Sequence, residues 1–291
     1  MKRFLLLFLV CILVACKQAP KETTAKAVPH SKLIEVFKAS HKGYPNISVH
    51  RGGKGLLNYP ENCLETIKFL NDSISAVYEV DVAQTKDGQL VLLHDNAIDR
   101  TTTGSGKISD LTYAELQQFN LIDDFGNKTD YKIPLFSEVL TWCSNNNVIL
   151  TIDIKRSVSQ KDVINAIRKA KAEDISLVIT YDLKQARMAY ELAPDLLLSV
   201  PARNHDEFDR LLKSGIPTKN MIAFTGTRLS DQSLFQRLHD ENIVCILGTL
   251  GNLDNRAEAR GEHLYRQWID LGADILATDR PFEAFLSVNQ K

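Results

Sequence analysis

Short apolar runs recur along the chain after residue 45, and most of them alternate with longer stretches that have helical spacing. Nine of these runs are rich in β-branched and other apolar residues, a composition that predicts β-strands. They lie at 46–50, 76–82, 89–94, 147–154, 175–180, 196–200, 221–224, 243–247 and 273–278. A strand followed by a helix, repeated in this way, predicts a parallel sheet with right-handed crossovers.

The run at 89–94 breaks the alternation, because only residues 83–88 separate it from the run before. A parallel crossover needs about a dozen residues or more, so the Asp87-Gly88 pair predicts a tight turn and an antiparallel return. The other eight strands with their helices predict an α/β fold, a TIM-type (β/α)8 barrel over residues 41–291. The hairpin and the segment after it, about 84–134, become a small insertion after the second strand.

The amino-terminal residues are expected to direct export. Residues 1–15 join two basic residues to an apolar run that is too short to cross a bilayer permanently, which predicts a signal peptide. The end of this segment and Cys16 resemble the lipobox of bacterial lipoproteins, in which the cysteine is lipidated; an ordinary signal peptide is the alternative. Residues 16–40 are predicted to be the lipidated cysteine and a flexible tether. We therefore expect an exported protein, lipid-anchored to a bacterial membrane in the periplasm or at the cell surface.

Composition narrows the class of partner. The 35 basic and 36 acidic residues give a net charge of −1 without long blocks of one sign, which argues against a nucleic-acid surface and favours a small-molecule partner. The oligomeric state is open. Three cysteines fall in the predicted barrel, and an odd number at wide spacing favours buried free thiols: Cys63, Cys143 and Cys245.

Acidic side chains gather at the ends of two neighbouring predicted strands. Glu79 and Asp81 share one face of their strand because side chains alternate, and Asp153 and Lys155 do the same on the next barrel strand. Carboxylates this close repel each other unless a cation balances them. One divalent cation, Ca²⁺ or Mg²⁺, held by Glu79, Asp81 and Asp153 is the favoured interpretation, and a buried salt-bridge network is the alternative.

Two histidines are expected at the same face of the barrel. His50 ends the first strand and is followed by Arg51, and His94 ends the returning arm of the hairpin. Together with Lys155 they suit an anionic substrate whose reaction needs a base on one side and an acid on the other. Arginine can grip a phosphate through two parallel hydrogen bonds, and lysine adds a point charge.

An ordered set of motifs resembles the glycerophosphodiester phosphodiesterase family. The resemblance spans residues 50–281, and the ordered set is far more specific than any one of its members. The matching segments are His50-Arg51-Gly52, Pro60-Glu61-Asn62, Glu79-Val80-Asp81-Val82, Thr85-Lys86-Asp87-Gly88, His94-Asp95, Arg100 to Gly106, Asp153-Ile154-Lys155 and Gly272 to Pro281.

The resemblance implies a TIM barrel with a small insertion and metal-dependent hydrolysis of glycerophosphodiesters to glycerol phosphate and an alcohol. It implies His50 and His94 as the catalytic acid and base, without deciding which begins as which. It implies metal ligands at Glu79, Asp81 and Asp153, and substrate contacts at Arg51, Lys155 and Glu61. The expected partner is a small glycerophosphodiester.

Two positions depart from the family pattern. Asp153 stands where the family usually has Glu, which withdraws a ligand by roughly 1.5 Å, one carbon-carbon step, and favours Ca²⁺ over Mg²⁺. Residues 247–252 replace a motif that usually includes an aromatic residue. The alternatives are therefore a phosphodiesterase of the same fold acting on another polyol phosphodiester, or a binding barrel without activity. Arg100-Thr101-Thr102 is interpreted as an ordinary turn of the insertion, and a direct substrate role is the alternative.

Overall fold

A closed parallel barrel forms the body of the molecule, whose computed structural model describes residues 30–41 and 43–289. Nine strands lie in the order β1-β9-β8-β7-β6-β5-β4-β2-β3, and a further pairing of β1 with β2 closes the barrel. All nine predicted strands are present. Their bounds are β1 Ile47–Val49, β2 Val77–Gln84, β3 Leu90–Leu92, β4 Leu150–Ile154, β5 Ser176–Ile179, β6 Leu197–Pro201, β7 Met221–Phe224, β8 Cys245–Gly248 and β9 Ile275–Thr278.

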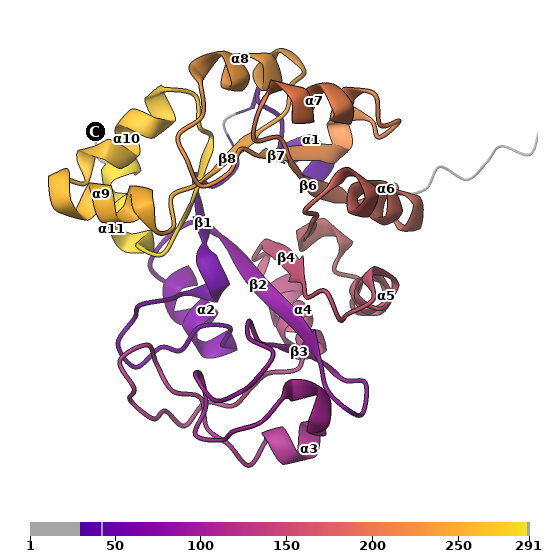
Figure 1. Ribbon diagram of the computed structural model, residues 1–291, viewed down its shortest axis with the longest axis vertical. Helices are drawn as coiled ribbons and strands as arrows, with labels where there is room; N and C mark the ends of the chain where they lie inside the picture. The colour runs from indigo at the N-terminus through magenta and orange to yellow at the C-terminus, as the bar shows by residue number, and fades with distance from the viewer. Residues whose placement is uncertain (1–29, 42, 290–291) are drawn as a thin grey trace, which may run out of the picture.

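The hairpin predicted after the second strand is confirmed. β2 pairs parallel with β4 on one side and antiparallel with β3 on the other, where Val82 lies opposite Leu92. β2 is the longest strand, and its final residues extend beyond the barrel to meet β3. The chain between β3 and the next barrel helix forms the insertion, which carries the short helix α3 (Tyr113–Leu116) and lies to one side of the barrel (Figure 1).

Helices surround the strands on the outside (Figure 1). Several begin at residues that cap them: the side chains of Asp182, Asn204 and Asp231 accept hydrogen bonds from the first turns of α6, α7 and α8. One large apolar core lies between the helices and the sheet. The helix bounds are α2 Leu64–Asn71, α4 Phe136–Asn146, α5 Gln160–Ala170, α6 Leu183–Leu192, α7 His205–Leu212, α8 Gln232–Asp240, α9 Asn252–Arg260, α10 His263–Asp270 and α11 Pro281–Asn289.

A short helix, α1 (Leu33–Val36), closes the amino-terminal end of the barrel. Leu33, Ile34 and Phe37 are buried against residues at the beginnings of several strands. The tether predicted for residues 16–40 is therefore too long at its end, because a single turn of helix gives too few apolar positions to show a period in the sequence. The predicted signal peptide, Cys16 and the tether up to residue 29 lie outside the described residues.

The three cysteines predicted to be buried free thiols are buried and unpaired. Cys143 and Cys245 belong to the main core, and Cys63 packs under the insertion. Burial raises the pKa of the Cys63 and Cys143 thiols to about 12, so both are neutral and act as small apolar side chains. Within residues 30–41 and 43–289, no helix combines the length and apolar character that crossing a bilayer requires.

Candidate active site

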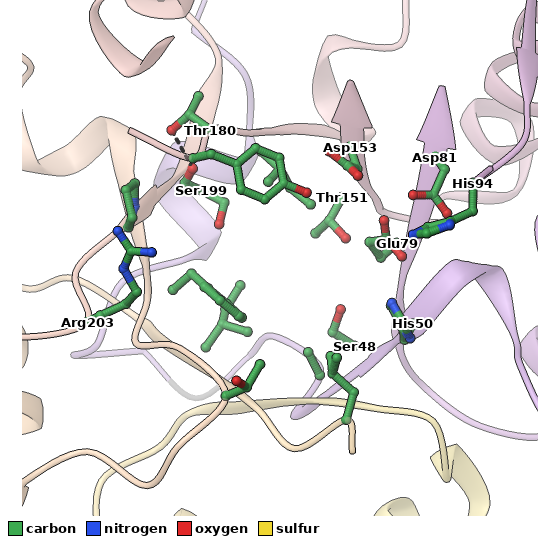
Figure 2. Close-up of a pocket in the computed structure, with 18 residues that line it drawn as sticks. Ser48, His50, Glu79, Asp81, His94, Thr151, Asp153, Thr180, Ser199 and Arg203 are labelled. Carbon is green, nitrogen blue, oxygen red and sulfur yellow. Dashed lines mark hydrogen bonds between the residues drawn. The ribbon is translucent and has the colours of Figure 1, made fainter. Parts of the chain in front are cut away.

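A cavity of about 310 Å³ opens at the carboxyl ends of the barrel strands (Figure 2). His50, His94 and the three predicted acids line it. The other predicted site residues lie next to them. Arg51 contacts Glu79 and His94. Lys155 contacts Asp81 and Asp153, and Glu61 contacts Arg51. The barrel thus brings together residues that lie more than a hundred positions apart in the chain.

A strained turn at the end of β1 places His50 and Arg51. Arg51 has φ 53° and ψ 33°, a left-handed conformation that costs energy for any residue other than glycine. The turn is held because the Arg51 amide donates to Glu79 Oε2 at 2.6 Å and its carbonyl accepts from the Asn62 amide at 2.7 Å. Gly52 follows with φ 65°, and a side chain there would meet Ile67 at 3.1 Å.

The three predicted acids form one cluster. Asp81 on β2 lies directly opposite Asp153 on β4 in the register of the two parallel strands, and Glu79 is two residues before Asp81 on the same face. Their ligand atoms lie within 4.8 Å of one another. Figure 2 shows the three carboxylates beside each other at the edge of the cavity, next to the histidines.

Lys155 is the nearest cation to this cluster. Its ammonium lies 2.5 Å from Asp81 Oδ1 and 2.9 Å from Asp153 Oδ2. Although burial works against ionisation of Asp81, Lys155 and Asn62 hold the pKa of that carboxyl below its ordinary value. Lys155, which was predicted to contact the phosphate, thus forms ion pairs with Asp81 and Asp153 in this structure. Such pairs are also what the alternative of a buried salt-bridge network predicted.

The donor set fits a divalent cation. Burial, followed by the charges of Asp81 and Asp153, raises the pKa of Glu79 well above its ordinary value, so one lysine does not balance three acids. Burial also raises the pKa of Asp153. Among the described residues, the buried Asp153 Oδ1 atom has no hydrogen-bond partner. Oxygen ligands with an excess of negative charge and a free lone pair are what Ca²⁺ and Mg²⁺ bind.

Asn62 fixes one of these ligands. Its Nδ2 donates to Asp81 Oδ2 at 2.7 Å, and its Oδ1 accepts from the Asp81 amide at 2.9 Å. Asn62 itself has φ 53°, a left-handed backbone conformation that residues other than glycine adopt only where the surrounding structure holds them in place. Asn62 lies within one of the sequence motifs, but no role was predicted for it, because a contact across 19 residues leaves no local signal.

Each histidine is held through Nδ1 by a carboxylate. His50 Nδ1 lies 2.6 Å from Asp279 Oδ1, and His94 Nδ1 lies 2.7 Å from Asp95 Oδ1. A carboxylate accepts, so the Nδ1 atom of each ring carries the hydrogen and Nε2 is left for chemistry. Neither Asp95 nor Asp279 was predicted to have this role, although both occur in the sequence motifs.

His94 makes a second hydrogen bond, which shows whether its Nε2 atom donates or accepts. Its Nε2 lies 2.8 Å from Nη2 of Arg51, which can only donate. The Nε2 atom of His94 therefore accepts, and the ring is neutral in this arrangement.

Glu61 joins the two arginines of the site. Its carboxylate accepts hydrogen bonds from the guanidinium group of Arg51 at 3.1 Å and from that of Arg100 at 2.7 and 3.0 Å. Glu61 is almost fully buried. Although burial opposes ionisation, these arginines lower the pKa of Glu61. Arg100 also donates from Nε to Asp95 at 2.6 Å. Arg100 lies in the insertion, as expected from the sequence, and it links Glu61 to the carboxylate that holds His94.

Known proteins resemble this chain over the whole barrel. A model of the glycerophosphoryl diester phosphodiesterase family matches residues 50–282. A glycerophosphodiester phosphodiesterase of Bacillus altitudinis is 32% identical over 245 residues, which are 82% of this chain and 96% of that protein. The chain spans 63% of the length of an uncharacterized Bacillus subtilis relative and 38% of human glycerophosphodiester phosphodiesterase 1.

Solved structures share the fold. A glycerophosphoryl diester phosphodiesterase from Parabacteroides distasonis ATCC 8503 gives a TM-score of 0.80 at 32% identity, covering 90% of this chain and 93% of that chain. A phosphodiesterase of Oleispira antarctica in complex with the product sn-glycerol-3-phosphate gives a TM-score of 0.68 at 19% identity, covering 85% and 98%. At 19% identity the second likeness concerns the fold alone.

Proposed function

Because this chain belongs to the glycerophosphoryl diester phosphodiesterase family, we propose that it hydrolyses glycerophosphodiesters to glycerol phosphate and an alcohol. The observation that carries the proposal is the pair of carboxylate-held histidines, His50 and His94, beside a cluster of three acids in one cavity. Two imidazoles, each held by a carboxylate at Nδ1 and directed to the site through Nε2, supply the acid and the base that cleavage of a diester needs. The product bound to the Oleispira antarctica protein, sn-glycerol-3-phosphate, is the product class proposed for this chain.

Glu79, Asp81 and Asp153 are proposed to hold one divalent cation. When bound, such a cation neutralises charge on the phosphate and lowers the pKa of a hydroxyl group next to it. Asp153 ends one carbon short of the glutamate that the family resemblance would place there, so we propose Ca²⁺, whose coordination is looser than that of Mg²⁺.

The side chains of the protein are proposed to transfer the protons, orient the histidine rings and bind the phosphate. One histidine removes the proton from the attacking glycerol hydroxyl, and the other donates a proton to the leaving alcohol; their roles reverse when water opens the resulting cyclic phosphate. Asp95 and Asp279 orient the rings and stabilise the charge that each ring gains. Arg51, fixed by Glu61 and by its contact with His94, is proposed to grip the phosphate, and Lys155 to add a second positive charge.

Proton transfer by two groups does not account for the rate by itself. Each positioned acid or base contributes a factor of about 10²–10⁴, whereas phosphate esters hydrolyse so slowly that enzymes accelerate them by far more. The cation and the two basic residues must stabilise the charge of the transition state for the remainder.

The proposal is tested with purified protein lacking residues 1–15, assayed on glycerophosphocholine with Ca²⁺, with Mg²⁺ and with EDTA. EDTA-sensitive release of glycerol phosphate supports the proposal. Turnover of bis(p-nitrophenyl) phosphate alone indicates a diesterase for another polyol, and binding without turnover under every metal indicates a barrel that binds and does not cleave. Either of the last two results refutes the proposed activity.

Export and anchoring are a separate proposal that rests on the sequence of residues 1–16. The protein is proposed to be held at a bacterial membrane by lipid on Cys16. Labelling of expressing cells with a radioactive fatty acid, followed by isolation of the protein, is expected to label the full chain and not the Cys16→Ser variant. Equal labelling of both proteins, or of neither, contradicts anchoring at this residue.

A further inference from the structure

The wall of the cavity opposite the acids is largely apolar, although the hydroxyl side chains of Thr180, Tyr181, Ser199 and Thr227 also line the cavity. In the closed order of eight strands, β7 lies four places from β2, which puts it straight across the mouth from Glu79 and Asp81. Figure 2 shows the cavity between the labelled acids and histidines on one side and Arg203 on the other. The apolar residues that line the far wall come from β5 to β8 and the turns after them: Ile179, Pro201, Phe224, Ile246 and Leu250.

Phe224 owes its place in this wall to Gly248. Phe224 is the last residue of β7, and Gly248 is the last residue of the neighbouring strand β8. A Cβ atom at position 248 would lie 3.1 Å from Phe224 Cζ, 3.0 Å from Thr227 Cγ2 and 3.2 Å from the Gly226 carbonyl oxygen. Carbon atoms prefer about 3.5–4.0 Å, so the ring occupies space that any other residue at 248 would take.

The charge at the rim of this wall is already balanced. Arg203 donates from Nε and Nη2 to the carboxylate of Glu207, at 2.5–3.0 Å, and its stem lies 3.3 Å from the position that a Cβ on Gly226 would take. The only acids that line the cavity, within the described residues, are Glu79, Asp81 and Asp153 on the opposite side. The far wall therefore offers no carboxylate to a primary ammonium. Its hydrogen-bonding side chains for a group with several hydroxyls are few, and one of them, Thr180, already donates from Oγ1 to the Ser199 carbonyl oxygen at 2.8 Å.

The two arms of a glycerophosphodiester differ in what they need. The glycerol arm carries the attacking hydroxyl and must lie at the acids and histidines, where its hydroxyls find partners. The leaving alcohol is roughly in line on the other side of the phosphorus. Polar groups buried without partners are unfavourable, whereas methyl groups gain from an apolar wall, and a quaternary ammonium also gains from the face of an aromatic ring.

We propose that Phe224, seated over Gly248, forms the subsite for the leaving alcohol and selects a quaternary ammonium alcohol such as choline over polyols such as inositol. This inference rests on the proposed diesterase function and adds the substrate preference of the same site. The two residues act as a pair: Phe224 makes the contact, and Gly248 provides the space for it.

The test measures kcat and KM for glycerophosphocholine and glycerophosphoinositol with the metal-loaded protein, following the glycerol phosphate that both release. Wild-type protein is expected to prefer the choline diester. Phe224→Leu is expected to lower that preference about tenfold, through KM and with kcat within about twofold, because one cation–π contact is lost. Phe125→Leu, at an exposed aromatic residue of the insertion, is the matched control and should change neither value.

Gly248→Ala tests the pairing. The added methyl group displaces the Phe224 ring and is expected to lower the choline preference as well. In a Phe224→Leu background the same change should have a much smaller further effect on preference, since leucine has no atom at the Cζ position and only the contacts with Thr227 and the Gly226 carbonyl oxygen remain. Melting temperatures show whether each variant is folded.

The same measurements distinguish failure of the Phe224 subsite from failure of the diesterase function. If wild type and variants hydrolyse both diesters with the same preference, the Phe224 subsite is refuted and the diesterase function stands. If wild-type protein hydrolyses no glycerophosphodiester with any metal, the proposed function is refuted and the subsite is refuted with it.

Discussion

Replacing Lys155 with methionine tests how the acidic cluster is balanced. Lys155 contacts both Asp81 and Asp153, and all three side chains are largely buried. The side chain of Lys155 is 18% exposed, that of Asp81 2% and that of Asp153 8%. Methionine keeps the approximate length of the side chain and removes its charge. We expect the variant, with no added metal, to be less stable than wild type, because the three clustered carboxylates then lack a compensating cation.

The size of the effect follows from the two contacts. At an effective dielectric constant of about 20, contacts of 2.5 and 2.9 Å are each worth about 6 kcal/mol of Coulomb attraction. Desolvation of the lysine offsets much of that, and removing one partner of a buried pair typically costs about 3–5 kcal/mol. For a domain of this size, such a loss lowers the melting temperature by roughly 10 °C.

The stability lost on replacing Lys155 with methionine should depend on pH. The pKa values of Glu79 and Asp153 are raised in the folded protein, so both carboxyls bind protons more tightly there than in the unfolded chain. Such groups destabilise the fold increasingly as pH rises from their unfolded pKa through their folded pKa. The difference between wild type and Lys155→Met should therefore be larger at pH 8 than at pH 5, where protonation relieves the repulsion.

Thermal unfolding followed by circular dichroism in EDTA measures this difference, with Lys161→Met at an exposed lysine of α5 as the control. Adding Ca²⁺ should then raise the melting temperature of Lys155→Met more than that of wild type, because the ion replaces the lost charge. If the variant melts like wild type in EDTA, or if Ca²⁺ stabilises it less than wild type, the cluster is not the charged cation site described here.

Three further predictions concern activity. His94→Ala should lower kcat at least about a hundredfold in the glycerol phosphate assay without lowering the melting temperature; turnover near that of wild type removes His94 from the mechanism. Asp279→Asn should lower kcat by about a hundredfold with KM within about threefold, because the amide cannot hold and stabilise a charged His50; a change confined to KM contradicts this positioning role. Asp153→Glu extends a ligand by roughly 1.5 Å and should raise activity with Mg²⁺ relative to Ca²⁺ in a metal titration, whereas an unchanged ratio argues against Asp153 as a ligand.

The strand pattern and the acid pair could be predicted because they are local. Each strand is a short apolar run between turn and helix signals, and the tight turn at Asp87-Gly88 allows only an antiparallel return. Alternation along a strand places Glu79 and Asp81 on one face without any knowledge of the rest of the molecule. That Asp153 joins them follows from the order of neighbouring parallel strands, which the βα pattern also predicts.

Other features depended on contacts between distant parts of the chain. The hydrogen bond from His50 to Asp279 spans 229 residues and forms only because β1 pairs with β9. The burial of Leu33, Ile34 and Phe37 requires the open end of a finished barrel.

The sequence by itself thus determined the order of strands and helices, the barrel and the residue types at its mouth, since these depend on local periodicity. Tertiary structure alone decided that Asp279 holds His50, that Lys155 also reaches Asp81 on the neighbouring strand, and that Phe224 faces the acids from across the barrel. Those relations depend on the closure of the sheet and on the directions of individual side chains, and neither is encoded in any short segment of the chain.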